Sequence, residues 1–469
     1  MIGRICRSAM RTFPDGQRAP PQPRIDRLPF VTTSPQEVSM PRIHVRIAPV
    51  VALAALVLLP AKAEAAEPER VEAITEDDIV LRMVRYANPG GVPVILQTGF
   101  TANHLAMDLP VEGYSIAQWF HSRGYDVYAT NLRGHGEGEI RSDGPADCDW
   151  TYDDFVAYDV GAIIDRVTEI SGREPFWVGH SMGGMVAYGY LQGAHFENVI
   201  VDREWVRRGL FDWELVDIIE PRIVADPTLA DDRQEGLAGL VTISAAPRAA
   251  WEVYVTWWNW PLLLFDVDKF WAYNLIIDQL AHDTYAQIAV SILNCIPIED
   301  VAEFMTADIR DIPFVGGLLA DFLAWVFDVV ATSFLLADIF NPQNMDQQVI
   351  DVFVARGFDN ISGSVTQQFM QSVRKRGLRA YDHRDSLHDP FRYGQAMAEI
   401  SLPVLFVSGQ FDKLANDNVI RRHGYDAVSS EDRTLHRVLG HGHGDIVLGI
   451  DAFDLTWEPV EEWIAARIF

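Results

Sequence analysis

Ser181 has the sequence surroundings that most clearly predict chemistry in this chain. It lies in the pentapeptide Gly179-His180-Ser181-Met182-Gly183, between the apolar run 175–178 and the amphipathic run 185–191. A serine on a sharp turn from a strand to a helix presents its hydroxyl as an exposed nucleophile. The flanking glycines are needed because such a turn brings the two backbones too close for side chains. The pattern predicts acyl transfer to the Ser181 hydroxyl.

A serine hydroxyl is a weak nucleophile, so it needs a histidine to accept its proton and a carboxylate to orient that histidine. Asp412 is the expected acid, because it follows an expected strand, and loops at the carboxyl ends of such strands gather at binding sites. Two histidines, His441 and His443, compete as the base in the segment 440–445. The glycines around them allow this loop to fold back over Ser181. The residues alone leave both histidines open.

Backbone N–H groups aimed at the developing oxyanion would complete such a site. The first expected donor is the N–H of Met182, which follows the nucleophile at a helix N-terminus. The second is the N–H of Phe100, in the loop Gln97-Thr98-Gly99-Phe100 after another expected strand. No histidine pair has metal-ligand spacing, so we expect neither a metal nor another cofactor.

The elements that must position these groups alternate along the chain. From residue 79 onward, short apolar runs alternate with amphipathic ones, which predicts a mostly parallel sheet flanked by helices. A helix is expected over 151–170, with Thr151 and Asp154 as its capping box. The polar segment 195–235 is expected to be a surface excursion. Strands are expected over 79–86, 92–97, 124–130, 176–180, 240–244, 404–408 and 434–439.

The alternation is interrupted over residues 247–399, which we expect to form a large helical cap between two halves of the core, 70–246 and 400–469. The cap begins with five tryptophans and contains the apolar run 312–340, which carries three aspartates. Each central aspartate would cost about 2.5–3.5 kcal/mol in a bilayer, so a membrane span is not expected. A well-packed helical core and a lid that faces lipid remain open alternatives.

The first 66 residues are expected to lie outside the fold. Residues 1–39 have the composition of a disordered or mis-assigned N-terminal extension. Residues 40–66 have the pattern of a signal peptide, with Arg42 and Arg46 before the apolar run 47–59 and a small-residue cleavage site at 61–63. That run has 13 residues, short of the ~20 that a spanning helix needs. The pattern predicts a secreted or periplasmic protein.

The net charge argues against one class of partner, and the cysteine content leaves two alternatives for Cys148 and Cys295. The net charge of −28 over 469 residues argues against a nucleic-acid partner, because phosphates would be repelled. Cleavage of the signal peptide would remove Cys6 and leave Cys148 and Cys295, either as a disulfide or as two free thiols. The oligomeric state has no signature in the sequence.

The sequence from residue 79 to 469 resembles the acid lipases related to gastric and lysosomal acid lipase, within the α/β-hydrolases. The resemblance is weakest in the cap. The segments that carry it are 97–100, 125–133, 150–164, 178–183, 369–382, 404–412 and 443–445.

The resemblance implies an α/β-hydrolase fold and a division of roles at the site. The base histidine of the family stands in an H-x-D segment, which corresponds to His443-Gly444-Asp445. It therefore implies Ser181, Asp412 and His443 as a triad, with Met182 and Phe100 as oxyanion donors. Two positions depart from the family: Thr98 stands in place of a histidine, and Met182 in place of a common glutamine.

These features together predict an exported serine ester hydrolase that acts on lipid or other long-chain acyl esters. The apolar cap is the reason for expecting a long acyl chain in the substrate, and it predicts contact with a membrane or lipid interface. An acyltransferase or polyester-degrading enzyme with the same triad is the first alternative. The second is a catalytically silent relative that binds an apolar ligand.

Overall fold

The structure is a computed structural model that describes most of the chain after residue 67. The described residues are 68–145, 148–209, 211–248, 295–296, 341–375, 377–381 and 389–468. The expected extension 1–39, the expected signal peptide 40–66 and most of the expected cap therefore lie outside the described residues.

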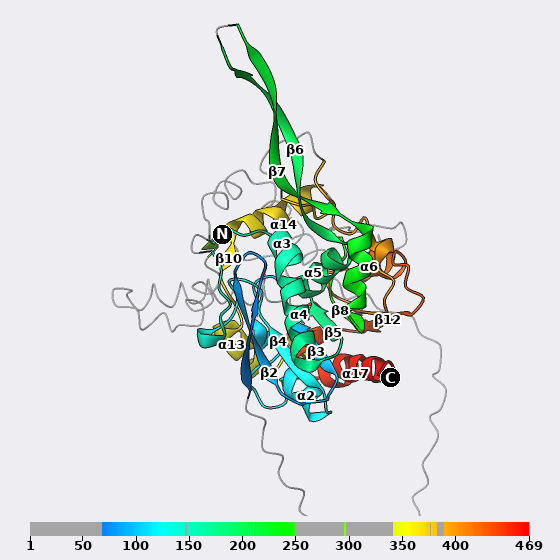
Figure 1. Cartoon of the computed structure of the whole chain (residues 1–469). Coiled ribbons are helices and arrows are strands. Elements are labelled where there is room, and N and C mark those ends of the chain that lie inside the picture. Colours follow the sequence, from blue (N-terminus) through cyan, green and yellow to red (C-terminus); the bar gives the residue numbers. More distant parts are fainter. Residues whose placement is uncertain are drawn as a thin grey trace, which may run out of the picture. The chain divides into compact units, whose positions relative to one another are not determined.

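An eight-stranded sheet is the centre of the described fold (Figure 1). Its strand order is β1-β2-β4-β3-β5-β8-β11-β12. β2 runs antiparallel to β1 and β4, and the other neighbouring pairs are parallel. The expected mostly parallel sheet is confirmed. Its strands are β1 (Glu69–Ile74), β2 (Val80–Tyr86), β3 (Pro93–Gln97), β4 (Asp126–Thr130), β5 (Phe176–His180), β8 (Gly239–Ile243), β11 (Val404–Gly409) and β12 (Arg433–Val438).

All seven expected strands are present within two residues of their expected bounds. β1 was not expected as a strand. In β1 only Val71 and Ala73 face the core, and charged residues alternate with them. Two small apolar residues are a weak strand signal, and pairing with β2 supplies the order that the local sequence lacks.

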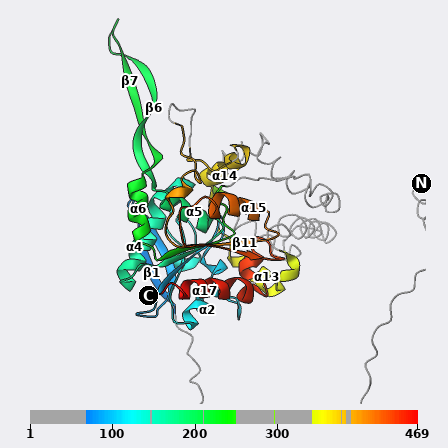
Figure 2. The same ribbon diagram turned by 90° about the vertical axis from the view of Figure 1, so that its right-hand side faces the viewer.

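Helices cover both faces of the sheet because its buried strands place successive side chains on opposite faces. On β3, Ile95 belongs to the core under α4 and α5, whereas Val94 and Leu96 belong to the core under α2, α13 and α17. Figure 2 shows α4, α5 and α6 on one side of the sheet and α2 and α17 on the other. The principal helices are α2 (Ile116–Ser122), α4 (Val160–Ser171), α5 (Met182–Leu191), α6 (Pro227–Glu235), α13 (Gln347–Arg356), α14 (Gly363–Lys375) and α17 (Glu458–Ala465).

Short helical turns supplement these helices. Among the described residues they are η1 (His104–Ala106), η2 (Gly138–Ile140), α3 (Tyr152–Asp154), η3 (Phe155–Asp159), η6 (Pro342–Asn344), η7 (Met397–Glu399), α15 (Asp417–Ile420), η8 (Arg421–Tyr425), α16 (Asp445–Leu448) and η9 (Phe453–Trp457).

The helix expected over 151–170 is present, with one irregular turn. Thr151 and Asp154 form the expected capping box at its start. The turn Phe155–Asp159 is a π-helix before the regular part begins at Val160. Within this turn, buried Asp159 accepts hydrogen bonds from the backbone N–H and the Nε–H of Arg133, at 2.9 and 2.8 Å. The irregular turn therefore presents a carboxylate to the loop after β4.

The segment expected as a surface excursion forms a long antiparallel hairpin, β6 (Ala194–Arg207) and β7 (Trp213–Ala225), followed by α6. The hairpin extends away from the sheet (Figure 1). Part of the expected cap is also described: α13, α14 and the short pair β9 (Cys295–Ile296) and β10 (Ile361–Ser362). Within the described residues, no helix combines the length and the apolar character that crossing a membrane requires.

Candidate active site

Ser181 occupies a strained turn between β5 and α5, as the pentapeptide predicts. Its φ is 53° and its ψ is −126°, a conformation that a residue other than glycine rarely adopts. The turn is held by the N–H of Ser181, which donates to the carbonyl of Ile243 at 2.9 Å, and by the N–H of Gly184, which donates to the Ser181 carbonyl at 3.0 Å. Such strain keeps the serine side chain at the mouth of the turn.

The glycines of the elbow have no room for a side chain. A Cβ on Gly179 would lie 2.5 Å from the carbonyl oxygen of Gly183, and one on Gly183 would lie 2.5 Å from the carbonyl oxygens of Gln97 and Thr98. Gly183 therefore packs directly against the loop after β3. This close approach brings the nucleophile next to the segment expected to supply an oxyanion donor.

Gly183→Ala is expected to lower both stability and turnover. The new Cβ would push against backbone atoms, and overpacking of this kind costs about 1–3 kcal/mol. We expect the free energy of unfolding to fall by that amount and kcat for a soluble ester to fall at least about tenfold, because displaced donors stabilise the oxyanion less well. Denaturant unfolding and steady-state kinetics measure the two effects. Gly236→Ala is the matched control, since a Cβ there meets nothing closer than 3.4 Å. Unchanged kcat in Gly183→Ala would contradict this role of the close approach.

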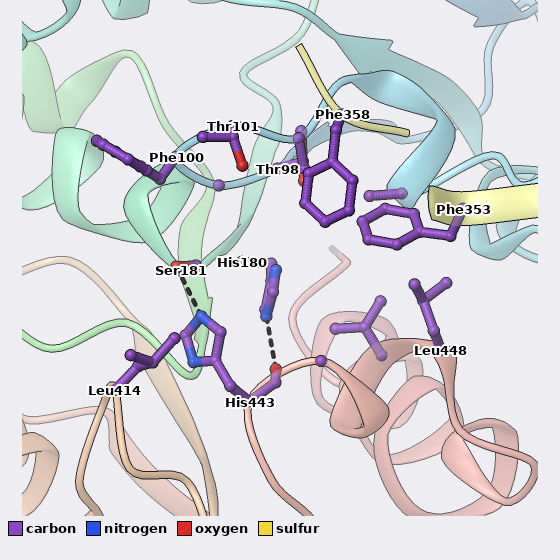
Figure 3. Close-up of a pocket in the computed structure, with 15 residues that line it drawn as sticks. Thr98, Phe100, Thr101, His180, Ser181, Phe353, Phe358, Leu414, His443 and Leu448 are labelled. Carbon is purple, nitrogen blue, oxygen red and sulfur yellow. Dashed lines mark hydrogen bonds between the residues drawn. The ribbon is translucent and has the colours of Figure 1, made fainter. Parts of the chain in front are cut away.

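Ser181, His443 and Asp412 lie in one hydrogen-bonded chain, although they are far apart in the sequence. The Nε2 of His443 lies 2.8 Å from the Ser181 Oγ, and its Nδ1 lies 2.9 Å from Oδ2 of Asp412. Figure 3 shows the His443 ring directed at Ser181. With the proton on Nδ1, His443 donates to Asp412 and its Nε2 accepts from the serine hydroxyl. This is the tautomer that a general base for Ser181 requires.

Asp412 is a buried carboxylate whose charge is compensated locally. Its Oδ1 accepts hydrogen bonds from the N–H groups of Leu414 and Ala415, at 2.8 and 2.7 Å. Burial alone would raise its pKa. The electrostatic attraction and hydrogen bond of His443, together with the N–H of Ala415, outweigh burial, so the pKa of Asp412 lies below its ordinary value. Asp412 is therefore ionised near neutral pH and can stabilise an imidazolium.

His441, the competing base, points to a different partner. Its Nε2 lies 2.9 Å from Oδ1 of Asp451, and its Nδ1 lies 3.0 Å from the carbonyl oxygen of Leu439. The structure thus separates the two histidines of the loop. Only His443 is brought to Ser181.

Asp445, the third residue of the H-x-D segment, stabilises the histidine loop by hydrogen bonds to its backbone. This carboxylate is fully buried and accepts hydrogen bonds from the N–H of Gly442, the N–H of Asn341 and the amide of Asn344. The Asn344 amide also donates to the carbonyl of Gly440 at 2.9 Å. The turn before α13 therefore helps to hold the loop that carries His443.

His180 supports the same loop from the strand side. Burial, together with the neighbouring His443, lowers the pKa of His180 to about 3, so the ring is neutral at ordinary pH. Its Nε2 lies 2.9 Å from the carbonyl oxygen of His443, and an oxygen can only accept (Figure 3). The proton of His180 is therefore on Nε2, and this N–H holds the backbone of the proposed base.

The two expected oxyanion donors flank Ser181. Met182 begins α5, where the first backbone N–H groups have no partner within the helix. Phe100 follows Gly99, and a Cβ on Gly99 would lie 2.7 Å from the Ser181 Cβ. Within the described part of the chain, neither the N–H of Met182 nor that of Phe100 donates to another protein group. Both are therefore available to a developing oxyanion near Ser181.

A second set of contacts, which sequence reasoning missed, holds the Phe100 loop. The two ring nitrogens of His135 face carbonyl oxygens: Nδ1 lies 2.9 Å from Arg133 O and Nε2 lies 3.1 Å from Phe100 O. Buried Asp359 accepts a hydrogen bond from the N–H of Gly136 at 2.8 Å, and its own N–H donates to the carbonyl of Thr101 at 2.6 Å. Burial raises the pKa of Asp359, and the neighbouring His135 offsets part of that rise. The loop after β3, the turn after β4 and the chain after α13 are thus joined beside the site.

His135→Leu is expected to impair catalysis without changing the reacting groups. Leucine removes the ring nitrogen that lies 3.1 Å from the carbonyl oxygen of Phe100. Without this contact, the N–H of Phe100 is held less firmly in its position near Ser181. Complete loss of an oxyanion donor costs about 10²–10³ in kcat, so we expect a decrease between about tenfold and that limit, with KM nearly unchanged. His135→Gln, which keeps one N–H donor, should recover part of the loss in the same assay. Equal activity of wild type and His135→Leu would show that this contact does not position the loop.

The hydroxyl of Ser181 opens into an apolar cavity of about 160 Å³. Figure 3 shows Phe353 and Phe358 on the side of the cavity opposite Leu414. The departure from the family at Thr98 lies in its wall, and the hydroxyl of Thr98 is buried without a hydrogen-bond partner among the described residues. The lining residues labelled in the figure are Thr98, Phe100, Thr101, His180, Ser181, Phe353, Phe358, Leu414, His443 and Leu448.

The sequence left open whether Cys148 and Cys295 form a disulfide or remain free thiols, and the structure answers this for Cys148. Cys148 is disulfide-bonded, and it packs against the core on the α4 side of the sheet. The side chain of its expected partner, Cys295, lies outside the described residues. Among the residues that the structure describes, no group of three or more His, Cys, Asp and Glu side chains could hold a metal ion.

The geometry agrees with a comparison to known families. The family model of the alpha/beta hydrolase fold matches residues 92–195, which contain β3, the elbow and α5. The chain has an α/β-hydrolase fold. The fold class expected from the sequence is confirmed. The relation to lipases is confirmed at family level, since the relatives in sequence are lipases.

Two of these relatives differ in how much of the chain they match. Triacylglycerol lipase 2 of Arabidopsis thaliana is 21% identical over 424 residues, which are 84% of this chain and 83% of that protein. Lipase member K of Mus musculus is 30% identical over 135 residues, and that alignment spans only 26% of this chain and 33% of the mouse protein. Among solved structures, the monoacylglycerol lipase of Paleococcus ferrophilus aligns with 83% of this chain and 99% of its own chain, with a TM-score of 0.44 and 15% identity.

Proposed function

We propose that this α/β-hydrolase is an exported serine hydrolase of the lipase and esterase type that cleaves lipid or other long-chain acyl esters. The observation that carries the proposal is the chain of hydrogen bonds from Ser181 through His443 to Asp412. The names of the sequence relatives support the reaction class. The apolar cavity beside Ser181 supports an acyl group as the part of the substrate that it binds.

In the proposed reaction, the Ser181 Oγ attacks the ester carbonyl while Nε2 of His443 accepts its proton. Asp412 stabilises the imidazolium that forms. The negative charge on the former carbonyl oxygen is bound by the N–H groups of Met182 and Phe100. His443 then donates its proton to the leaving alkoxide, which leaves as an alcohol. Water activated by the same histidine hydrolyses the acyl-serine and restores the free hydroxyl.

A panel of p-nitrophenyl esters from acetate to palmitate tests the substrate class. We expect kcat/KM to rise from acetate to longer acyl groups, because each added methylene buries apolar surface. A steady fall of kcat/KM from acetate onward would overturn the long-chain part of the proposal and leave the ester chemistry intact. The same reactions with added glycerol separate hydrolysis from acyl transfer, since acyl transfer would give an acylglycerol in place of the free acid.

Export is proposed from the pattern of residues 40–66. A basic start, an uncharged apolar run and a small-residue site are the features that signal peptidases recognise. N-terminal sequencing of the protein recovered outside the cytoplasm tests this directly. A mature N-terminus near residues 64–67 supports export with cleavage, whereas recovery of the uncleaved chain from the cytoplasm contradicts it.

A further inference from the structure

The β6–β7 hairpin carries an exposed apolar surface that the proposed reaction does not use. Its strands run for 14 and 13 residues, so the ribbon spans roughly 40 Å. A two-stranded ribbon in water is marginally stable by itself. The exposed fractions of its apolar side chains are high, at 64% for Trp205, 91% for Phe211 and 55% for Trp213. All three lie in or within a few residues of the turn between β6, which ends at Arg207, and β7, which begins at Trp213.

The register of the hairpin places these apolar residues on one face. Trp205 is paired with Leu215, and residues 213, 215 and 219 alternate along the same side of β7. Ile200 is paired with Ile219, on the other side of a register shift in β6. We call this face the aromatic face. Its apolar residues are Ile200, Trp205, Trp213, Leu215 and Ile219, with Phe211 at the turn. Arg203, Asp217 and Arg207 alternate with them on the same face.

Two ion pairs join charged residues near the end of the hairpin, and the first of them lies on the aromatic face. Nε of Arg203 lies 2.8 Å from Oδ1 of Asp217, and Nε of Arg208 lies 2.9 Å from Oε2 of Glu214. Residues 203–217 contain three arginines and four acidic residues, in a chain whose net charge is −28. This segment is therefore nearly neutral. An anionic surface would repel the chain as a whole and find no excess of cations here.

Exposed tryptophan and phenylalanine on a nearly neutral surface are suited to the interface between lipid and water. Tryptophan rings concentrate where apolar lipid meets water, because they combine an apolar ring with one N–H donor. A contiguous exposed apolar patch on a soluble fold marks a surface that binds a partner. The paired charges fit a surface without net charge.

We infer that the aromatic face of the β6–β7 hairpin binds the surface of zwitterionic phospholipid. This inference deepens the proposed function, since it brings a lipid hydrolase to a lipid surface through a part of the molecule outside the proposed active site. The hairpin acts as an anchor and takes no part in bond cleavage. Its loss reduces adsorption to lipid and leaves hydrolysis of dissolved esters unchanged.

Co-sedimentation of the full mature chain with phosphatidylcholine vesicles tests this inference. The variant Trp205→Thr/Phe211→Ser/Trp213→Thr removes the three aromatic rings and keeps strand-forming residues on β6 and β7. We expect its partition coefficient to fall at least about tenfold relative to wild type, because the loss of three rings removes most of the buried apolar area. Ile74→Ser/Ile450→Ser, which changes residues of 68% and 59% exposure outside the hairpin, should bind like wild type.

Further arms separate the inference from its competitors. Ser181→Ala should bind vesicles as tightly as wild type, so a failure of the catalytic proposal would not affect this test. The triple variant should hydrolyse p-nitrophenyl acetate at the wild-type rate, which shows that it is folded. Replacing half of the phosphatidylcholine with phosphatidylglycerol should weaken binding.

Four results would overturn the inference. They are absence of wild-type binding to phosphatidylcholine, equal binding by the triple variant, stronger binding to the anionic vesicles, and a wild-type dimer that the triple variant loses in light scattering. The last result would identify the aromatic face as a contact between two copies of the chain.

Discussion

Ser181→Ala is expected to reduce kcat for p-nitrophenyl esters by roughly 10⁵–10⁶-fold while the protein remains folded. The reason is that no acyl-serine can form without the Oγ, and the remaining groups can only orient water. The variant should be as stable as wild type in denaturant unfolding, because the lost oxygen has one partner, Nε2 of His443. Active-site titration guards against traces of wild-type enzyme. Hydrolysis by Ser181→Ala within tenfold of wild type would contradict the proposed mechanism.

Substitutions in the histidine loop are expected to separate His443 from His441 by several orders of magnitude. His443→Ala removes the group that accepts the serine proton and should cost about as much as loss of the serine itself. Asp412→Asn keeps the shape of the side chain but loses the charge that stabilises the imidazolium, and a loss of about 10⁴-fold in kcat is expected. Steady-state kinetics with one soluble ester measures all of these variants.

His441→Ala is the matched control for that comparison. Its ring faces Asp451 and the carbonyl of Leu439, away from Ser181. We expect kcat to stay within about tenfold of wild type, since the lost contacts support the loop and do not touch the reacting atoms. If His441→Ala and His443→Ala were equally inactive, the division of roles between the two histidines would be wrong.

Local sequence was sufficient to predict the parts of the site that depend on short segments. The elbow could be predicted from its pentapeptide, in which Gly179 is required by contacts with Gly183 and Gly184, although Gly183 is required by contacts with the distant loop after β3. Asp412 and the loop that carries His441 and His443 were expected from their places after expected strands, and the choice of His443 came from the resemblance of His443-Gly444-Asp445 to the H-x-D segment of the acid lipases. Their convergence on Ser181 could be expected from the topology of a parallel sheet, in which carboxyl ends of strands meet at one edge.

The missed features depend on contacts between segments that the sequence keeps far apart. Asp359 lies 223 residues from Gly136, to which it is hydrogen-bonded, and no local pattern marks it as a partner of the Phe100 loop. Asn341 and Asn344 support the histidine loop from positions 104 and 101 residues before Asp445. The signal available in the sequence for the contacts that hold the Phe100 loop was His135 itself, which stands two residues after Arg133 in the turn after β4.

The hairpin was missed for another reason. Residues 195–235 carry enough charge to suggest a surface segment, and that expectation matches the exposure of most of the side chains. The alternation of apolar residues at 213, 215 and 219 is a strand signal, but a strand with two solvated faces lacks the continuous apolar run of a buried one. The exposed rings of Trp205 and Trp213 can be recognised only once the pairing of the strands is known.

Covalent labelling with a fluorophosphonate tests the central claim, an activated serine at residue 181, most directly. Such a probe phosphonylates only a serine whose hydroxyl is activated as a nucleophile. Peptide mass spectrometry of the labelled protein should find one adduct, on Ser181, and His443→Ala should abolish it under the same conditions. Absence of any adduct on the folded wild-type protein, or an adduct on a different residue, would contradict the account.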